Sequence, residues 1–155
     1  MRNSLQKRTW AEVSLDNISH NYRAIRAALP EGCRFLGVVK ADAYGHGAVA
    51  VARLLESEGA DYLAVSCLDE AMELRSAGIT MPLLILGHTP SEYTETLIDN
   101  DITQTVSCLA KAQEFSARAA ALGRQLRIHI KIDTGMSRLG FLCGGDSFDE
   151  GVANV

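Results

Sequence analysis

The sequence predicts an α/β fold built on a parallel sheet. Short apolar runs alternate with segments whose apolar residues recur at helical spacing, and this alternation is typical of βα units. Each apolar run also follows the one before it after roughly 20 to 26 residues, the length of one such unit. Hydrophobic residues make up 47% of the chain and charged residues 22%, the profile of a globular domain with one core.

The first predicted element is a helix that follows a short extended run over residues 9–13. Its apolar residues recur at alternating steps of three and four, which is the spacing of one helix face. These residues are Leu15, Ile18, Tyr22, Ile25 and Leu29. Pro30 and Gly32 end the helix, because proline cannot continue it and glycine favours a turn.

Five apolar runs follow, each with the length of a strand that is buried on both faces. They cover residues 35–39, 62–66, 83–86, 102–106 and 126–132. Helical patterns lie between them, at about 48–55, 68–77, 91–99 and 109–122. Glycines end three of these helices, where glycine can adopt the left-handed cap. They are Gly59, Gly78 and Gly123, and residues 143–155 are expected to form a loop that enters another helix.

Composition and charge exclude several kinds of partner. The formal net charge is −4, and 15 lysines and arginines are scattered among 19 aspartates and glutamates, so we expect no binding to nucleic acid. No apolar window has the length of a membrane span or a signal sequence, and we therefore expect no membrane contact and a cytoplasmic location. The four cysteines lie far apart without a C-x-x-C pair and predict buried free thiols, with no metal site and no disulfide. They are Cys33, Cys67, Cys108 and Cys143.

The alternation of strands and helices does not by itself fix the kind of sheet. An open doubly wound sheet and a piece of an eight-stranded barrel share this pattern. No G-x-G-x-x-G follows a strand, and no G-x-x-x-x-G-K-[ST] occurs, which removes the usual reasons to expect a nucleotide-binding sheet.

The most suggestive residue for chemistry is Lys40, which directly follows the first apolar run. In barrels, active sites gather at the carboxyl ends of strands. A lysine whose stem lies against a buried strand can have its ammonium partly desolvated, which favours the neutral amine that reacts with a carbonyl group. A solvated lysine that simply closes a strand is the alternative reading of this residue alone.

The residues around Lys40 resemble the cofactor-lysine motif of bacterial alanine racemases, over the run Val38-Val39-Lys40-Ala41-Asp42-Ala43-Tyr44-Gly45-His46-Gly47. Three other stretches are similar to sequences of the same family, so that the resemblance extends over nearly the whole chain. They are Thr9–Val13 with Leu15-Asp16, Leu68–Ala71 with Leu74-Arg75, and Lys131–Gly140.

The resemblance implies a particular fold and assembly. Members have a barrel of the fold-type III pyridoxal-phosphate class, followed by a mostly β domain, and act as homodimers. Residues 15–155 are then expected to be the N-terminal part, about five strands, of a TIM-type (β/α)8 barrel that stops before closure. Residues 1–14 are expected to be an extended segment that belongs to a β domain outside this chain.

The resemblance also implies roles for individual residues. Lys40 is expected to bind pyridoxal 5'-phosphate covalently and to act as the base on one face of the substrate. Tyr44 is expected to hold the cofactor phosphate. Arg138 matches an arginine beside the cofactor's phenolic oxygen and the substrate carboxylate, and Lys131 matches a lysine that is carbamylated in some members and positions that arginine. No metal is expected.

Three nearby polar residues are interpreted as structural. His46 lies between two glycines, and we expect its imidazole to fix a tight strand-to-helix turn by hydrogen bonding. Asp42 and Asp133 are expected to cap loops by accepting hydrogen bonds from backbone N–H groups.

The implied activity is the interconversion of L-alanine and D-alanine by proton transfer between two bases, which supplies D-alanine for peptidoglycan. The second base of the family is a tyrosine of the partner subunit's second domain, and no tyrosine of this sequence matches it, so residues 1–155 alone are expected to be inactive. A racemase for serine or for several amino acids remains an alternative. A non-enzymatic single-barrel protein that binds pyridoxal phosphate is a second alternative, but the Tyr44–Gly47 and Asp133–Met136 runs argue against it. A purely structural role is a third alternative.

Overall fold

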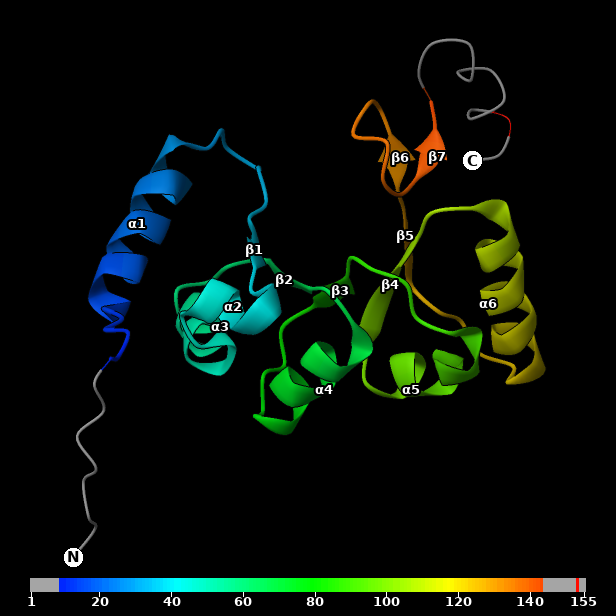
Figure 1. The fold of residues 1–155 in the computed structure, drawn as a ribbon, viewed down its shortest axis with the longest axis horizontal. Coiled ribbons are helices and arrows are strands. Elements are labelled where there is room, and N and C mark those ends of the chain that lie inside the picture. Colours follow the sequence, from blue (N-terminus) through cyan, green and yellow to red (C-terminus); the bar gives the residue numbers. More distant parts are fainter. Residues whose placement is uncertain (1–8, 144–152, 154–155) are drawn as a thin grey trace, which may run out of the picture.

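The structure is a computed structural model that describes residues 9–143 and Ala153. Its centre is a five-stranded parallel sheet in which the spatial order of the strands equals their order in the chain (Figure 1). The strands are β1 (Leu36–Val38), β2 (Tyr62–Val65), β3 (Leu83–Ile85), β4 (Ile102–Val106) and β5 (Ile128–Ile130). A doubly wound sheet reverses its strand order at a switch point. The continuous order seen here is instead that of a barrel.

Helices precede and connect the strands and lie along one side of the sheet (Figure 1). They are α1 (Leu15–Ala28), α3 (Ala48–Ser57), α4 (Leu68–Ser76), α5 (Thr94–Asp99) and α6 (Leu109–Ala121). The helix predicted over 91–99 is divided into a short 3₁₀ turn, η1 (Ser91–Tyr93), and α5. Among the described residues, none of the helices combines the length and the apolar composition needed to cross a membrane.

The hydrophobic core lies between the sheet and these helices. Leu63 and Val65 of β2, together with Leu83 and Ile85 of β3, are completely buried on this side. Ala52 and Leu74 contribute from α3 and α4. Burying a leucine, isoleucine or valine side chain contributes about 1.5–3 kcal/mol, so the three inner strands β2, β3 and β4 contribute strongly to the stability of the sheet.

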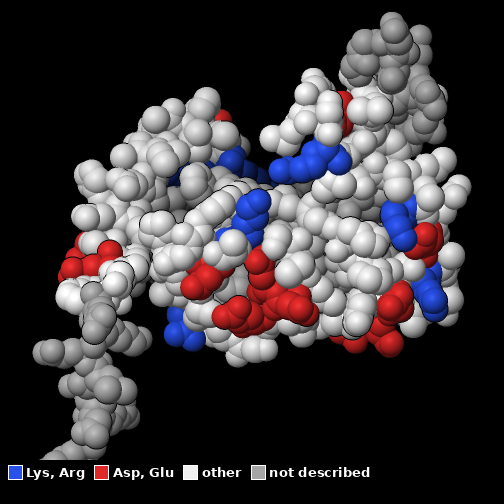
Figure 2. All heavy atoms as spheres, in the orientation of Figure 1, with Lys and Arg blue, Asp and Glu red and all other residues white. Residues whose placement is uncertain are grey.

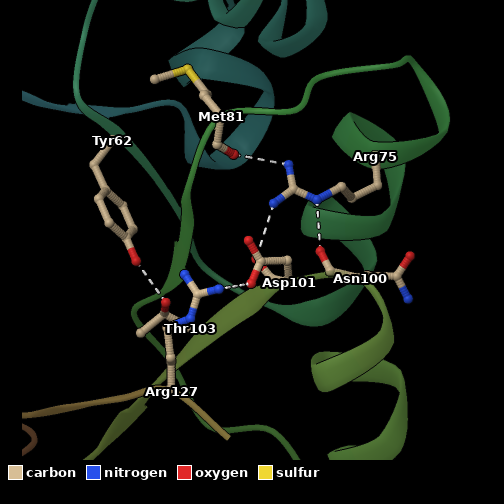
Figure 3. Close-up of polar contacts among 7 residues, drawn as sticks. All are labelled: Tyr62, Arg75, Met81, Asn100, Asp101, Thr103 and Arg127. Atoms are coloured by element: carbon tan, nitrogen blue, oxygen red, sulfur yellow. Dashed lines mark hydrogen bonds and ion pairs between the residues drawn. The ribbon is translucent and has the colours of Figure 1, made fainter.

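The opposite face of the sheet is more polar. The strand register places Tyr62, Thr103 and His129 on this face. The Tyr62 hydroxyl and Thr103 Oγ1 lie 2.6 Å apart in a hydrogen bond (Figure 3), and the ring centroids of Tyr62 and His129 are 6.0 Å apart. This side of the sheet, which the helices do not cover, therefore combines polar side chains with the buried apolar residues Ala64 and Leu84.

Two of the predicted strands are not fully buried. Leu36 and Val38 of β1 are exposed, and so are all three residues of β5. These strands are the two edges of the sheet, and each lacks a neighbouring strand on one side within the described residues. The prediction of buried strands was therefore correct for the centre of the sheet and wrong for its edges.

The run predicted as one strand over 126–132 is also wrong as a single element. β5 ends at Ile130, and the chain continues into β6 (Ile132–Asp133), which pairs with β7 (Phe141–Leu142) in a separate two-stranded sheet. The chain changes partner because the Lys131 carbonyl accepts a hydrogen bond of 2.8 Å from the N–H of Phe141.

Local features agree with the sequence in most cases. The glycines predicted to cap helices, Gly59, Gly78 and Gly123, have φ of 80°, 85° and 63°. The four cysteines are free, as predicted, but Cys33 and Cys108 are exposed and the other two are only partly buried, so the prediction of buried thiols was wrong. The loop and helix predicted for 143–155 lie almost entirely outside the described residues.

Arg75 of α4 connects two loops at the amino end of the sheet. Its guanidinium lies between the loops that enter β3 and β4 (Figure 3). It donates hydrogen bonds to the carbonyl groups of Ile79 (2.8 Å), Met81 (3.0 Å), Asn100 (2.8 Å) and Asp101 (3.1 Å). The Asp101 carboxylate is also paired with Arg127. One side chain thus satisfies four backbone acceptors from two separate loops.

Replacing Arg75 by methionine should lower the free energy of unfolding by about 2–3 kcal/mol, because four carbonyl groups lose a charged donor while the packing of the stem is largely kept. Urea unfolding of the intact protein measures this change. Arg53→Met is the matched control, since Arg53 donates one exposed bond of 3.0 Å to the Ala77 carbonyl. Equal effects of the two substitutions would contradict the assigned role of Arg75.

Candidate active site

The candidate site lies at the carboxyl end of the sheet, beginning with Lys40. The N–H of Val39 still bonds to the Ala64 carbonyl at 2.9 Å, so the ladder between β1 and β2 reaches the residue before Lys40. Lys40 is half-buried and begins a short helical segment, α2 (Lys40–Gly45). The sequence placed this lysine correctly at the end of the first strand.

The α2 segment is left-handed. Ala41, Asp42, Ala43 and Tyr44 have φ of 50°, 54°, 51° and 56°, and none of them is glycine. This conformation brings Cβ close to the following carbonyl oxygen and costs about 1–2 kcal/mol per residue. Sequence reasoning anticipated a tight turn here from the glycines but missed the left-handed helix, because residue type alone disfavours it.

Hydrogen bonds within the segment hold it in place. The N–H of Ala43 donates to the Val39 carbonyl at 2.9 Å, and the N–H of Gly47 donates to the Asp42 carbonyl at 2.9 Å. The Asp42 carboxylate accepts the N–H of Ala48 at 2.7 Å, at the start of α3. Asp42 is therefore the loop cap that the sequence predicted.

His46 also contacts this turn. Its Nδ1 lies 2.9 Å from the Ala43 carbonyl oxygen, the kind of contact that the sequence predicted for this imidazole. Its side chain is exposed. The contact links the end of the left-handed segment to its middle, which adds to the bonds that determine the backbone there.

One hydrogen bond reaches the segment from α4. Glu70 accepts the N–H of Ala41 at 2.8 Å, and its second oxygen accepts the N–H of Ser66 at 2.6 Å and the Ser66 hydroxyl at 2.7 Å. Partial burial would raise the pKa of Glu70, but bonds from Ser66, Ala41 and Cys67 together outweigh it and hold the pKa below its usual value. Sequence reasoning gave Glu70 no role of its own.

The left-handed turn brings Tyr44 next to Lys40. Lys40 Nζ lies 5.8 Å from the centre of the Tyr44 ring, within the range of a cation–π contact. Tyr44 itself is 62% exposed, so its hydroxyl is accessible to a ligand. These two of the predicted site residues are therefore neighbours.

Arg138 is carried by the loop between β6 and β7, and Asp133 organises that loop. Asp133 Oδ1 accepts the N–H groups of Gly135 (2.9 Å) and Ser137 (3.0 Å), and Oδ2 accepts the N–H of Arg138 (3.0 Å). Hydrogen bonds from Gly135, Ser137 and the neighbouring amides lower the pKa of Asp133. Asp133 is thus a loop cap, as the sequence predicted.

The same loop needs a glycine where it returns toward β6. Gly140 has φ of 130°, and a Cβ added there would lie 2.8 Å from both the Lys131 carbonyl oxygen and the Asp133 nitrogen. Lys131 is held on both sides, since its own N–H bonds to the Val106 carbonyl at 2.9 Å. The backbone around Lys131 and Arg138 is therefore tightly defined.

The predicted residues come from opposite edges of the sheet. Lys40 and Tyr44 follow β1, whereas Lys131 and Arg138 follow β5. Within residues 9–143 no hydrogen bond or ion pair joins Lys40 to Arg138, and the Arg138 residue is exposed. Figure 2 shows basic side chains gathered in the hollow between α2 and the β6–β7 pair, an arrangement that suits an anionic ligand.

Comparison with known proteins identifies the family. The family model described as "Alanine racemase, N-terminal domain" matches residues 13–152. The chain belongs to the alanine racemase family. The resemblance seen in its motifs is therefore confirmed, and with it the prediction of the first five strands of a TIM-type barrel.

Individual members of the alanine racemase family are similar over most of this chain. An alanine racemase of Desulfosudis oleivorans is 47% identical over 131 residues, which are 84% of this chain and 34% of the relative. The solved alanine racemase of Clostridium difficile 630 is 48% identical with a TM-score of 0.85, over 97% of this chain and 40% of its own. A histidine racemase from Leuconostoc mesenteroides is 25% identical with a TM-score of 0.79, over 97% of this chain and 40% of its own. This chain thus spans between a third and two fifths of the length of these relatives.

The lowered pKa of Asp133 predicts a pH dependence of the Arg138 loop. The stabilisation that the carboxylate provides is complete above about pH 4, the usual pKa of a free aspartate, and is lost as the pH falls through its lower value in the folded protein. The amide proton shifts of Ser137 and Arg138 should follow this titration in NMR spectra. Asp133→Asn should abolish it, whereas Asp69→Asn should not. A midpoint at or above the value of a free aspartate would contradict the prediction.

Proposed function

We propose that this chain supplies the cofactor-binding part of a pyridoxal-phosphate-dependent racemase that interconverts L-alanine and D-alanine. The observation that carries the proposal is the position of Lys40, half-buried at the carboxyl end of β1, before a left-handed turn that holds Tyr44 beside it. A lysine at the end of a barrel strand is suited to covalent chemistry with a carbonyl group.

The residues of the site fit pyridoxal phosphate by their chemistry. Lys40 offers an amine for the aldehyde, and the exposed Tyr44 offers a hydroxyl for the phosphate. Arg138 offers a planar guanidinium for the phenolic oxygen and the substrate carboxylate, on a loop whose backbone is fixed by Asp133. When bound, the pyridoxal ring would delocalise the negative charge that forms at the substrate α-carbon.

Each residue has a distinct task in this proposal. Lys40 Nζ holds the cofactor and then takes or returns the α-proton on one face of the substrate. Arg138 orients the substrate by its carboxylate. Lys131 precedes β6 and lies near Arg138 in the chain, and carbamylation would give it a negative charge able to hold that guanidinium.

The proposed reaction also needs a second base and a second domain, which residues 1–155 do not supply. We infer that a tyrosine from a second domain of a partner subunit supplies the other base, as a homodimer would allow. Residues 9–14 form neither helix nor strand, and Trp10 is 72% exposed, which supports a contact between this segment and a second domain. In a cytoplasmic racemase of this kind, the product D-alanine would supply peptidoglycan synthesis.

The alternative of another amino acid as substrate has a specific observation in its favour. The similar histidine racemase has the same fold over 97% of this chain, so the fold does not restrict the substrate to alanine. Serine is the other candidate, since it differs from alanine by one hydroxyl. The site described here would serve any of these substrates through the same lysine.

Lys40 should be the residue that pyridoxal phosphate modifies. Incubation of the intact protein with the cofactor, reduction with borohydride and peptide mass spectrometry should find a phosphopyridoxyl group on Lys40 and none at this position in Lys40→Ala. Lys111→Ala is the matched control, because Lys111 is paired with Glu114 on α6, away from the site. Labelling spread evenly over the lysines of the wild type would contradict the proposed role.

Substrate assays separate the candidate activities. We expect kcat/KM of the intact protein for alanine to exceed that for serine by about tenfold or more, since apolar walls around the substrate methyl group would disfavour the added hydroxyl. Circular dichroism or a chiral coupled assay measures both rates, with L-histidine as a third substrate. A higher kcat/KM for serine or histidine would replace alanine in the proposal and keep the role of Lys40.

A further inference from the structure

We propose that Glu70 is the positioning residue for Lys40, because its carboxylate fixes the peptide group between Lys40 and Ala41 and so the direction in which the Lys40 side chain leaves the backbone. The inference deepens the proposed function and rests on the role of Lys40 as the cofactor lysine. It assigns Glu70 no contact with cofactor or substrate.

Both carboxylate oxygens of Glu70 accept hydrogen bonds. Oε1 accepts the Ala41 N–H at 2.8 Å, while Oε2 accepts the N–H and the hydroxyl of Ser66 at 2.6 and 2.7 Å. Ser66 directly follows β2, and Ala41 follows β1 by three residues. One side chain of α4 thus connects the carboxyl ends of two neighbouring strands.

The Ala41 N–H group affects the backbone conformation of Lys40 directly. It belongs to the peptide plane that begins at the Lys40 carbonyl, so fixing it determines ψ of Lys40 and φ of Ala41 together. On the other side of Lys40, the Val39 N–H bonds to the Ala64 carbonyl of β2 at 2.9 Å. Lys40 is therefore held between two hydrogen bonds of its flanking backbone N–H groups, one directly to β2 and the other through the Glu70 side chain to Ser66.

The left-handed turn makes this anchor necessary. Ala41 is the first of four successive non-glycine residues with positive φ, a strained conformation that persists only where surrounding contacts determine it. Most of the hydrogen bonds to residues 40–47 come from within residues 39–48. Among the described residues, the bond to Glu70 ties this turn to a helix that is distant in the chain, whereas the bonds to α3 come from the helix that directly follows the turn.

A carboxylate suits this position better than its amide. An ionised glutamate only accepts hydrogen bonds, and the groups of Ala41 and Ser66 that face it act as donors. A glutamine has only one acceptor oxygen, and that oxygen satisfies more donors when it faces the N–H and hydroxyl of Ser66. Its NH₂ group then faces the Ala41 N–H, so Glu70→Gln removes the anchor with almost no change of volume.

The test begins with cofactor-free protein. We expect Glu70→Gln to raise the exchange rate of the Ala41 amide hydrogen by about tenfold or more, because the strained turn opens more often. We also expect trace acetylation of Lys40, measured relative to Lys111 across a pH series, to speed up by about threefold or more, because the Lys40 amine leaves its half-buried position. Glu73→Gln, an exposed residue of the same helix, should change neither.

Ser66→Ala provides a graded control, since it removes one bond to Oε2 and keeps the bond from Ala41 to Oε1. It should leave the relative acetylation of Lys40 close to the wild-type value. If Glu70→Gln leaves both Ala41 exchange and Lys40 acetylation at wild-type values, the positioning role is wrong. A fall in the urea midpoint alone, with Lys40 reactivity unchanged, would likewise reduce Glu70 to a structural role and overturn the proposal.

A second variant covers the case in which Glu70→Gln does not fold. Ala41→Gly relieves the cost of positive φ, so the double variant Ala41→Gly/Glu70→Gln should fold and still show the altered Lys40 reactivity. Wild-type reactivity in that folded double variant would overturn the proposal.

Borohydride labelling of the wild type with pyridoxal phosphate tests the cofactor role separately. Absence of label on Lys40 would reject the proposed function, whereas label on Lys40 with no effect of Glu70→Gln would reject the positioning role alone.

Discussion

Four successive residues after β1 occupy a region of backbone space that amino acids with a Cβ avoid, and the placement of Lys40 and Tyr44 depends on that turn. A right-handed continuation would turn the residues after Lys40 in another direction relative to the sheet. The surrounding structure offsets the strain with local bonds, with the buried side chain of Ala43 and with the carboxylate of Glu70. Stability is thus given up locally to place an amine beside a phenol.

The two loops that carry the candidate site use the same physical device. Each has an acidic side chain that accepts several backbone N–H groups: Glu70 for the turn after β1 and Asp133 for the loop before β7. Hydrogen bonds to a charged acceptor are stronger than those between neutral groups. Because the acids bind backbone, they leave the side chains of Lys40 and Arg138 free for ligand chemistry.

The sequence predicted those features that depend on local pattern. The apolar runs located the strands, the glycines marked helix ends, and the motif around Lys40 placed the site at the end of β1. What it missed depends on contacts between distant residues. The left-handed turn is held in part by Glu70, 29 positions further along the chain, and the break after Ile130 follows from a bond between Phe141 and Lys131. The edge strands are likewise exposed because each lacks a neighbouring strand on one side, and a local sequence pattern does not predict which strands lie at an edge.

The sequential strand order has a consequence for how this polypeptide acquires its structure during synthesis. Leu36 pairs with Tyr62 and Leu83 with Ile102, so each strand finds its partner in the βα unit that left the ribosome just before it. Contacts of modest sequence separation form with a small loss of loop entropy and favour rapid folding. The chain can therefore add one unit at a time to an existing sheet edge, and the anchor at Glu70 becomes available to the Lys40 turn as soon as α4 has been translated.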